Sequence, residues 1–400
     1  MQKFEYYAPT RIVFGEDTEK RAGELAREYG ASRVCVIYGG GSAKKSGLLD
    51  TVEASLKDAG LASFCSGGVV PNPRLSTVRR MIGEAKEFGA DFILAVGGGS
   101  VIDTAKAVAH GTANPDVDVW DFWLRKVALT RSMPIGAILT ISAAGSETSD
   151  SSVITDDSKE PWTKRGINTE FNRCRFAIMD PKLTMTLPVY QIASGVADIF
   201  MHTDERYFTT ILGNHLTDQL AEGLFRDIIE WGPKGVADPQ NYEAMSEIMW
   251  CGSVSHVGMT GVGAKGDTGR EGDWGVHQLG MALSALYDVT HGPSLTATWG
   301  SWARYVCSEN PARFAQLGRR VFGVTEADDE KAAEAAIAAV EKFYQSIGMP
   351  ISIHELMGRE LSDEELAAVA KECSYDYTRK IGTFKVLDAD DILEIYKMAR

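Results

Sequence analysis

The sequence predicts an α/β domain with a parallel, Rossmann-like sheet over residues 1–188, followed by an all-helical domain over residues 189–400. Two patterns predict this division. In the first half, short β-branched runs alternate with amphipathic stretches, which is typical of right-handed βαβ units and a mostly parallel sheet. After Leu187-Pro188 the strand signals fade, and the remaining residues show the spacing of successive helices.

Four runs in the first half have the length and composition of buried strands. They are Arg33–Tyr38, Asp91–Val96, Ile135–Thr140 and Phe176–Asp180. Amphipathic stretches between them, such as Thr77–Phe88 and Val101–His110, predict the intervening helices. In the second half, Ile192–Leu212 and Glu326–Ile347 read as helices, and the latter is stopped by Gly348 and Pro350.

Composition narrows the class of protein. The chain has 400 residues, 44% of them hydrophobic, and 41 Lys and Arg against 55 Asp and Glu give a net charge of −14. This balance disfavours a broad nucleic-acid surface. We find no apolar signal-peptide core in the first twenty residues, no run long enough to span a bilayer, and six scattered cysteines without a CxxC pair. We therefore expect a cytoplasmic globular enzyme with neither a nucleic-acid nor a membrane partner.

Two glycine-rich turns follow predicted strands. Gly97-Gly98-Gly99-Ser100 links a strand to a helix, and Gly39-Gly40-Gly41-Ser42 follows Arg33–Tyr38 in the same way. Such turns let backbone N–H groups approach an anion at a helix N-terminus. They could also be tight βα turns that only need glycine for positive φ. Two of them, each at the carboxyl end of a parallel strand, favour a dinucleotide lying across the strand ends.

A literal GxGxxG at Gly261–Gly266 does not add to this signal. It lies in the helical half, where no strand feeds it, so we interpret it as a loop.

An acid and three histidines suggest a metal site. Asp198 and His202 are four residues apart in a predicted helix, so their side chains share one face. His277 follows Gly272-Asp273-Trp274-Gly275, and His291 precedes Gly292-Pro293. Together they could bind one divalent cation through oxygen and nitrogen. From spacing alone, a helix-surface acid–histidine pair is usually structural, and His277 and His291 could equally be hydrogen-bonded core or interface residues.

A series of motifs along the chain removes much of this ambiguity. In order they are Pro71-Asn72-Pro73, Gly97–Lys106, Thr140 with Gly145-Ser146-Glu147, Asp180-Pro181, Leu187-Pro188, Gly195–Asp198 with His202, and Gly272-Asp273-Trp274 before His277. Through them the chain resembles the iron-containing (group III) alcohol dehydrogenases over essentially its full length. The first glycine triplet, with Lys44, Lys45 and Gly47, is most similar to the NADPH-dependent butanol dehydrogenase branch.

The resemblance implies a fold, a chemistry and a set of site residues. It implies a dehydroquinate synthase-like architecture, with an NADP-binding domain at 1–188 and a metal-binding, catalytic domain at 189–400. It also implies a homodimer that transfers hydride between NADPH and small to medium aliphatic aldehydes such as butanal, aided by one Fe²⁺ or Zn²⁺ acting as a Lewis acid. The family's metal-binding and catalytic residues carry over to Asp198, His202, His277 and His291. The coenzyme contacts carry over to Gly39, Gly40, Ser42, Gly97, Gly98, Ser100, Thr140, Lys164 and Leu187.

The choice of coenzyme follows from the first triplet. NAD-specific sites usually place an acid at the end of the second strand, where it would repel a 2′-phosphate. Here no acid follows Tyr38 until Asp50, and Ser42 with Lys44 or Lys45 could bind the phosphate instead. We therefore expect NADP(H) rather than NAD(H).

One position departs from the family pattern. Many relatives carry a histidine one helical turn after the third ligand, near the nicotinamide, where this chain has Met281. If that histidine relays the alcohol proton, we expect this chain to use water or a ribose hydroxyl instead, or to turn over more slowly.

Two other functions remain open on the same scaffold: a polyol dehydrogenase of the glycerol type, and a dehydroquinate synthase-like lyase. A synthase should place several Lys and Arg around a phosphorylated acid. The sequence neighbours of the ligands are instead apolar, which favours an uncharged aliphatic substrate; they are Phe200, Met201, Trp274, Leu279 and Met281.

Overall fold

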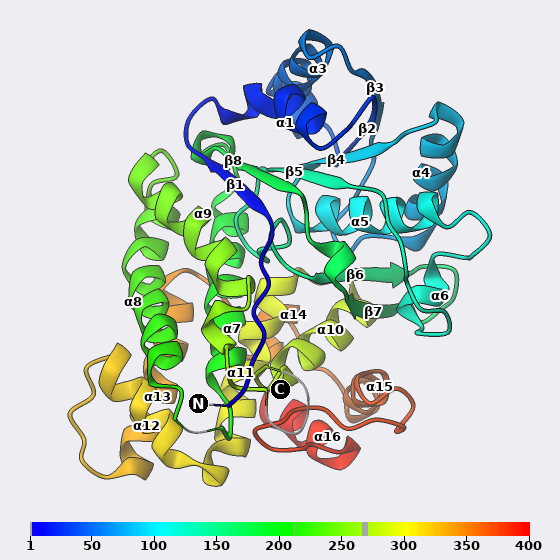
Figure 1. Ribbon diagram of the computed structural model, residues 1–400. Helices are drawn as coiled ribbons and strands as arrows, with labels where there is room; N and C mark the ends of the chain where they lie inside the picture. Colours follow the sequence, from blue (N-terminus) through cyan, green and yellow to red (C-terminus); the bar gives the residue numbers. More distant parts are fainter. Residues whose placement is uncertain (1, 212, 266–270) are drawn as a thin grey trace. The chain divides into compact units, whose positions relative to one another are not determined.

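The computed structural model describes residues 2–211, 213–265 and 271–400. The chain divides into two compact units, an α/β unit of residues 7–187 and a helical unit of residues 188–400 together with residues 1–6. The elements of each unit are labelled in Figure 1. Across the described ranges, none of the helices is both long and apolar enough to cross a membrane.

The α/β unit contains a six-stranded sheet whose neighbouring strands all run parallel. In spatial order the strands are β1 (Arg11–Phe14), β8 (Phe176–Met179), β5 (Ile135–Leu139), β4 (Phe92–Gly97), β2 (Arg33–Tyr38) and β3 (Ala62–Ser66). The predicted parallel sheet is confirmed. The four predicted strands are β2, β4, β5 and β8, and each lies within one residue of its expected bounds.

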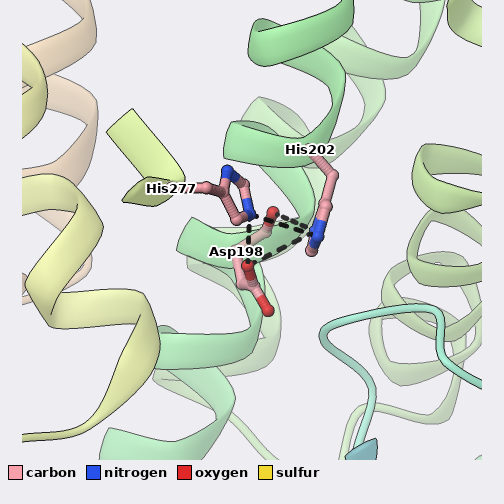
Figure 2. A group of neighbouring side chains, drawn as sticks. All are labelled: Asp198, His202 and His277. Atoms are coloured by element: carbon pink, nitrogen blue, oxygen red, sulfur yellow. Dashed lines mark hydrogen bonds and ion pairs between the residues drawn. The ribbon is translucent and has the colours of Figure 1, made fainter. Parts of the chain in front are cut away.

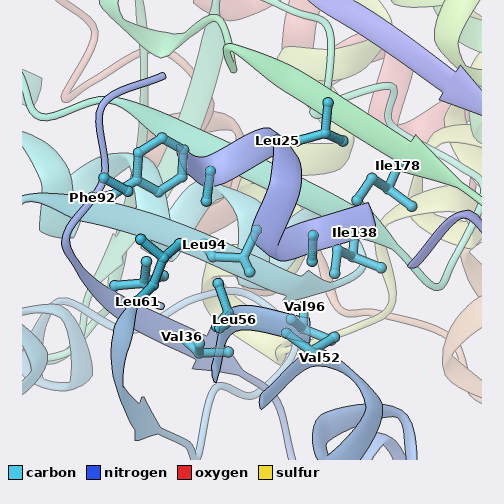
Figure 3. Packing of buried hydrophobic residues seen from close by; sticks show 14 of the residues in the cluster. Leu25, Val36, Val52, Leu56, Leu61, Phe92, Leu94, Val96, Ile138 and Ile178 are labelled. Atoms are coloured by element: carbon cyan, nitrogen blue, oxygen red, sulfur yellow. The ribbon is translucent and has the colours of Figure 1, made fainter. Parts of the chain in front are cut away.

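Helices cover both faces of this sheet. One face packs its alternate side chains, including Val36, Leu94 and Val96, against Val52 and Leu56 (Figure 3). These two residues belong to α3 (Leu48–Asp58), which packs beside α1 (Ala22–Glu28). The other face is covered by α4 (Leu75–Phe88) and α5 (Gly99–Ala113) (Figure 1). Because all six residues of β4 are buried, its sequence is continuously apolar rather than alternating.

The strand order reverses between β2 and β4. From β2 the chain moves outward to β3, then crosses back to place β4 on the opposite side of β2. The carboxyl ends of β2 and β4 therefore flank a topological switch point, which is where open α/β sheets bind ligands.

Several strands escape prediction. The edge strands β1 and β3 were not expected, nor was the antiparallel hairpin of β6 (Ser151–Asp156) and β7 (Thr163–Asn168). β1 has four residues, of which one is buried, and β7 carries Lys164 and Arg165. Edge and hairpin strands are stabilised by their partner, so their own sequences show little apolar pattern. The short helices α2 (Ser42–Lys45) and α6 (Trp120–Trp123) complete the unit.

The helical unit contains ten α-helices among its described residues. They are α7 (Val189–Tyr207), α8 (His215–Ala237), α9 (Tyr242–His256), α10 (Gly275–Tyr287), α11 (His291–Val306), α12 (Pro311–Val321), α13 (Asp329–Ser346), α14 (Ile353–Met357), α15 (Asp363–Cys373) and α16 (Ala389–Met398). The predicted all-helical character of this half is confirmed, and α13 is the helix expected at 326–347.

The helix expected at 192–212 begins and ends earlier than predicted. It is α7, which starts at Val189 and ends at Tyr207 because Phe208 leaves the helical conformation with ψ at 94°. The hydroxyl of Thr209 then accepts a hydrogen bond from the Ile211 backbone at 3.1 Å, which favours a turn over another helical turn. Leu212 lies outside the described residues. So does Gly266 of the GxGxxG sequence, whose first glycine, Gly261, ends a short 3-10 helix.

Candidate functional site

Helix α7 carries two of the predicted ligands on one face. Asp198 and His202 are four residues apart, and both side chains are 5% exposed. The Nδ1 atom of His202 lies 3.0 Å from the Asp198 carbonyl oxygen and 3.3 Å from Asp198 Oδ1. Helical spacing therefore places a carboxylate and an imidazole side by side, as predicted from the sequence.

His277 approaches α7 from the first turn of α10. A close backbone contact allows this approach, since a Cβ atom on Gly272 would stand 2.1 Å from the Glu205 carbonyl oxygen. Gly272 has a φ of +85°, which glycine adopts readily. Asp273 stabilises the start of α10, because its side chain accepts a hydrogen bond from the Gly275 backbone N–H at 2.9 Å.

His291 is the first residue of α11, and its neighbour Gly292 brings it close to α7. A Cβ atom on Gly292 would stand 2.3 Å from the Ser194 carbonyl oxygen, so any larger residue would push the two helices apart. The side chain of His291 is 30% exposed, more than the other three candidate ligands.

The structure brings Asp198, His202 and His277 together in the helical unit, with His291 beside Asp198, and Figure 2 shows the first three facing one another. The Nε2 atoms of His202 and His277 are 3.2 Å apart. Asp198 Oδ1 lies 3.8 Å from the Nε2 atom of His277 and 3.8 Å from that of His291. Metal–ligand bonds of about 2.0–2.2 Å place the ligand atoms of a tetrahedral site about 3.4 Å apart, so these separations suit one cation.

The hydrogen bonds of the two buried histidines assign their tautomers. His277 Nδ1 lies 3.1 Å from Glu205 Oε1, and His202 Nδ1 faces the Asp198 carbonyl, so each Nδ1 carries the hydrogen. Both Nε2 atoms then present lone pairs to each other across 3.2 Å. Two facing lone pairs repel unless a cation lies between them.

A further histidine, His256, and an arginine, Arg206, adjoin this cluster. The ring of His256 packs 4.1 Å from the ring of His202, measured between centroids. Arg206 donates to His256 Nδ1 at 3.0 Å and to the carbonyls of His202 and Ser255. Burial and, after it, the neighbouring His256 and His277 hold the pKa of His202 well below its usual value. His202 is therefore neutral, as a metal ligand must be.

Glu205 is a site neighbour that the sequence analysis missed. It lies on α7 seven residues after Asp198 and is fully buried. Burial raises its pKa to about 8, although the backbone N–H groups of His277, Trp274 and Val276 oppose the rise. The spacing of 4 and then 3 residues from Asp198 was the available signal, since it places Glu205 on the ligand face. His256, by contrast, comes from another helix and left no signal in the spacing.

The expectation that Phe200 lies beside the ligands is wrong. Its ring packs against Phe225 at 4.6 Å and Phe343 at 5.2 Å. Two residues after Asp198, it projects about 200° around the helix from it and joins the apolar core. Trp274 does adjoin the ligands, with its ring 5.1 Å from that of His277.

In the α/β unit, most of the predicted coenzyme residues fall at one edge of the sheet. Tyr38 pairs with Val96, and Gly97 pairs with Leu139, so the turns after β2, β4 and β5 end side by side. Gly39 and Gly40 follow β2, and Ser42 begins α2. Gly97 ends β4, Gly98 follows it, and Ser100 lies in the first turn of α5, while Thr140 follows β5. Gly97 accepts a hydrogen bond from the Thr140 backbone at 3.1 Å.

Strand register does not place Lys164 or Leu187 at this edge. Lys164 lies on β7, is buried, and donates to Asn72 Oδ1 at 2.8 Å. Leu187 follows the 3-10 helix Pro181–Thr184, and its backbone N–H donates to the Thr184 carbonyl.

A parallel α/β unit with two glycine turns at its switch point, combined with a helical unit that gathers an acid and histidines, defines a metal-dependent, nicotinamide-linked dehydrogenase. The comparison with known families agrees. The model for iron-containing alcohol dehydrogenases matches residues 9–181, and the model for the C-terminal part of the same family matches residues 191–400. The chain belongs to the iron-containing alcohol dehydrogenase family.

Individual relatives match over the whole chain. It is 39% identical to a probable NADH-dependent butanol dehydrogenase of Bacillus subtilis, covering 99% of both chains. It is 32% identical to the NADPH-dependent aldehyde reductase YqhD of Escherichia coli, covering 100% of both. The solved structure of an NADH-dependent butanol dehydrogenase A from Thermotoga maritima superimposes with a TM-score of 0.94, at 33% identity over 100% of this chain and 99% of that one. The protein is thus an NAD(P)-dependent oxidoreductase, an alcohol dehydrogenase or aldehyde reductase that depends on a metal.

Proposed function

We propose that the protein reduces small to medium aliphatic aldehydes, such as butanal, with NADPH and one divalent metal. The gathering of Asp198, His202 and His277, with His291 beside Asp198, is the observation that carries the proposal. In this proposal, residues 1–188 bind the coenzyme and residues 189–400 bind the metal. We also expect a cytoplasmic homodimer with no nucleic-acid or membrane partner, which sedimentation and fractionation would test.

The ligand types fit a divalent cation such as Fe²⁺ or Zn²⁺. The 3.2 Å between the Nε2 atoms of His202 and His277 and the 3.8 Å from Asp198 Oδ1 to the Nε2 atoms of His277 and His291 suit such an ion. So do the two facing Nε2 lone pairs and the mixed oxygen and nitrogen donors. Four protein ligands complete a tetrahedral zinc shell, so a substrate needs a fifth position, which Fe²⁺ accommodates readily. Metal analysis of the purified protein identifies the resident ion.

Each part of the site then has a role. When bound, the cation supplies Lewis-acid stabilisation of the negative charge that develops on the substrate oxygen. Asp198 contributes the negative charge of the ligand set, and the burial of His202 keeps its imidazole neutral. The glycine turns after β2 and β4 offer backbone N–H groups to the coenzyme phosphates.

The preference for NADP(H) is supported by the end of β2. Tyr38 is followed by Gly39 and Gly40, and no acid stands there to repel a 2′-phosphate. Lys44 and Lys45 are exposed three and four residues after Gly41, within the short helix α2. The relatives named above include both NADH- and NADPH-dependent enzymes. The ratio of kcat/KM for NADPH to that for NADH on one aldehyde tests this preference, and a higher value for NADH would reject it.

An uncharged aliphatic substrate is supported by the neighbours of the ligands. Trp274 adjoins His277, and Met281 lies one helical turn beyond it, half-buried. The charge of Arg206 is already engaged by two backbone carbonyls and by the Trp274 ring, 4.6 Å away.

An aldehyde and alcohol series tests the substrate class. We expect kcat/KM to be highest for butanal and its neighbours in chain length, and low for glycerol and hydroxy acids. A clearly higher value for glycerol would favour the polyol dehydrogenase instead. Turnover of a phosphorylated acid without net coenzyme oxidation would favour the synthase-like lyase.

A further inference from the structure

Glu205 holds the third candidate ligand at two points. Its Oε1 atom accepts a hydrogen bond from the His277 backbone N–H at 2.7 Å and lies 3.1 Å from the His277 ring Nδ1. The carboxyl group is fully buried. One oxygen atom thus contacts both the main chain at the start of α10 and the imidazole ring that this turn carries.

We propose that Glu205 is a positioning residue of the metal site, which fixes the ring orientation and tautomer of His277 so that Nε2 faces the other ligands. The proposal rests on the metal site proposed above. It goes beyond it by assigning a role to a residue that binds neither metal nor coenzyme.

The reason is the symmetry of an imidazole ring. Without a partner at Nδ1, the ring of His277 can flip by half a turn or move its hydrogen to Nε2, and either change removes the lone pair from the site. An acceptor at Nδ1 prevents both changes. The backbone bond adds precision, because the same oxygen fixes the turn from which the ring projects.

Helix α7 therefore presents three functional groups on one face. Asp198, His202 and Glu205 follow one another at intervals of 4 and 3 residues. The helix that supplies two ligands would in this way also orient a third from a different helix.

The test measures metal binding directly, with Co²⁺ added to metal-free protein. Glu205→Gln keeps an oxygen acceptor but replaces the carboxyl group with an amide, and Glu205→Ala removes the acceptor as well. Loss of an outer partner of a metal-bound histidine typically weakens metal binding by about 10–100-fold. We expect about a tenfold weaker Co²⁺ affinity for Glu205→Gln and about 100-fold for Glu205→Ala, by chelator competition. The visible absorption band of bound Co²⁺ should also shift.

The neighbouring acid provides a matched control. Asp204 is equally buried on the same helix, but its carboxylate accepts from Trp299 Nε1 at 2.9 Å rather than from a histidine. Asp204→Asn should leave the Co²⁺ affinity within about twofold, whatever its effect on the melting temperature of the metal-free protein. Thermal unfolding of each metal-free variant separates a loss of folding from a loss of binding, and Glu205→Gln answers the question if Glu205→Ala does not fold.

The outcomes distinguish this inference from the proposed function. If Co²⁺ binds to the wild type but not to His277→Ala, the metal site stands. If the metal site stands, an unchanged Co²⁺ affinity and an unchanged Co²⁺ absorption spectrum in both Glu205 variants would overturn the positioning role. An equal loss of Co²⁺ affinity in Asp204→Asn would overturn it as well. If the wild type binds no Co²⁺ at all, the metal site itself is rejected and the inference with it.

Discussion

Replacing Gly292 with alanine should damage the metal site without touching any of its ligands. The added Cβ would stand 2.3 Å from the Ser194 carbonyl oxygen and 3.1 Å from its Cα, both backbone atoms that cannot rotate away. Ordinary contact begins near 3.4 Å, so the start of α11 must move by about 1 Å relative to α7. His291, the adjoining residue, moves with it.

The expected size of the effect follows from this displacement. A shift of that size would take the 3.8 Å separation of His291 Nε2 and Asp198 Oδ1 towards 5 Å, well beyond the spacing of about 3.4 Å between ligands of one cation. Misplacement of a reacting group by about 1 Å costs about 100-fold in rate. We expect kcat/KM for butanal to fall by that order, and overpacking to lower the free energy of unfolding by about 1–3 kcal/mol.

The assay compares metal affinity, butanal reduction and thermal unfolding in Gly292→Ala and in a control. Gly223→Ala is suitable, because Gly223 lies within α8 and an added Cβ meets nothing closer than the Arg226 guanidinium at 4.0 Å. The control should retain activity and gain about 0.5–1 kcal/mol of stability from helix propensity. Wild-type metal affinity and activity in Gly292→Ala would refute the reasoning, since they would mean that the approach of α11 to α7 does not shape the site.

Three further predictions concern the α/β unit. Gly40→Asp should lower the ratio of kcat/KM for NADPH to kcat/KM for NADH by about tenfold, which corresponds to roughly 1.4 kcal/mol. A Cβ atom at Gly40 meets no atom within 4 Å, so the substitution fits the fold. Gly83 on α4 is equally open, and Gly83→Asp should leave this ratio unchanged. Burial lowers the pKa of His110 from 6.5 to about 4, so as the pH falls the unfolded chain protonates this imidazole before the folded chain does. The free energy of unfolding should therefore fall by roughly 3 kcal/mol between pH 6.5 and about 4. Chemical unfolding of the wild type and of His110→Asn from pH 7 to 4 measures this loss, and the same pH dependence in both proteins would contradict the prediction. Lys106 is fully buried, donates to the Ser151 carbonyl at 2.6 Å and lies 3.9 Å from Asp103, whose side chain is 16% exposed. Lys106→Met should therefore lower the free energy of unfolding by about 3–5 kcal/mol. A loss below about 1 kcal/mol in denaturant titration would show that the Asp103 charge is compensated elsewhere.

The sequence predicted the elements whose own residues determine them. Buried central strands such as β4 need continuous apolar runs, and the glycine turns after them could be read directly. Edge strands such as β1 could not, because a short, half-exposed segment is stabilised by its neighbour rather than by its own pattern. The end of α7 was misplaced because the turn at Thr209 depends on a local side-chain bond that competes with the helix.

The candidate site was predictable in unequal parts. Helical spacing alone placed Asp198 and His202 together, and the same spacing could have revealed Glu205. His277 and His291 come from other helices, so their residue types only suggested a shared site, and the family resemblance was needed to assign them as ligands with the first two. Their approach depends on contacts at Gly272 and Gly292 between segments far apart in the chain, and no local pattern encodes such a distance.

The most direct test of the account is the metal dependence of aldehyde reduction. Protein stripped of metal is titrated with Fe²⁺ without oxygen, or with Zn²⁺, while NADPH oxidation by butanal is followed in the wild type and in His277→Ala. We expect no turnover without metal, recovery that saturates at one equivalent per chain in the wild type, and no comparable recovery in a folded His277→Ala protein. Full turnover by metal-free wild type, or by metal-free His277→Ala, would contradict it.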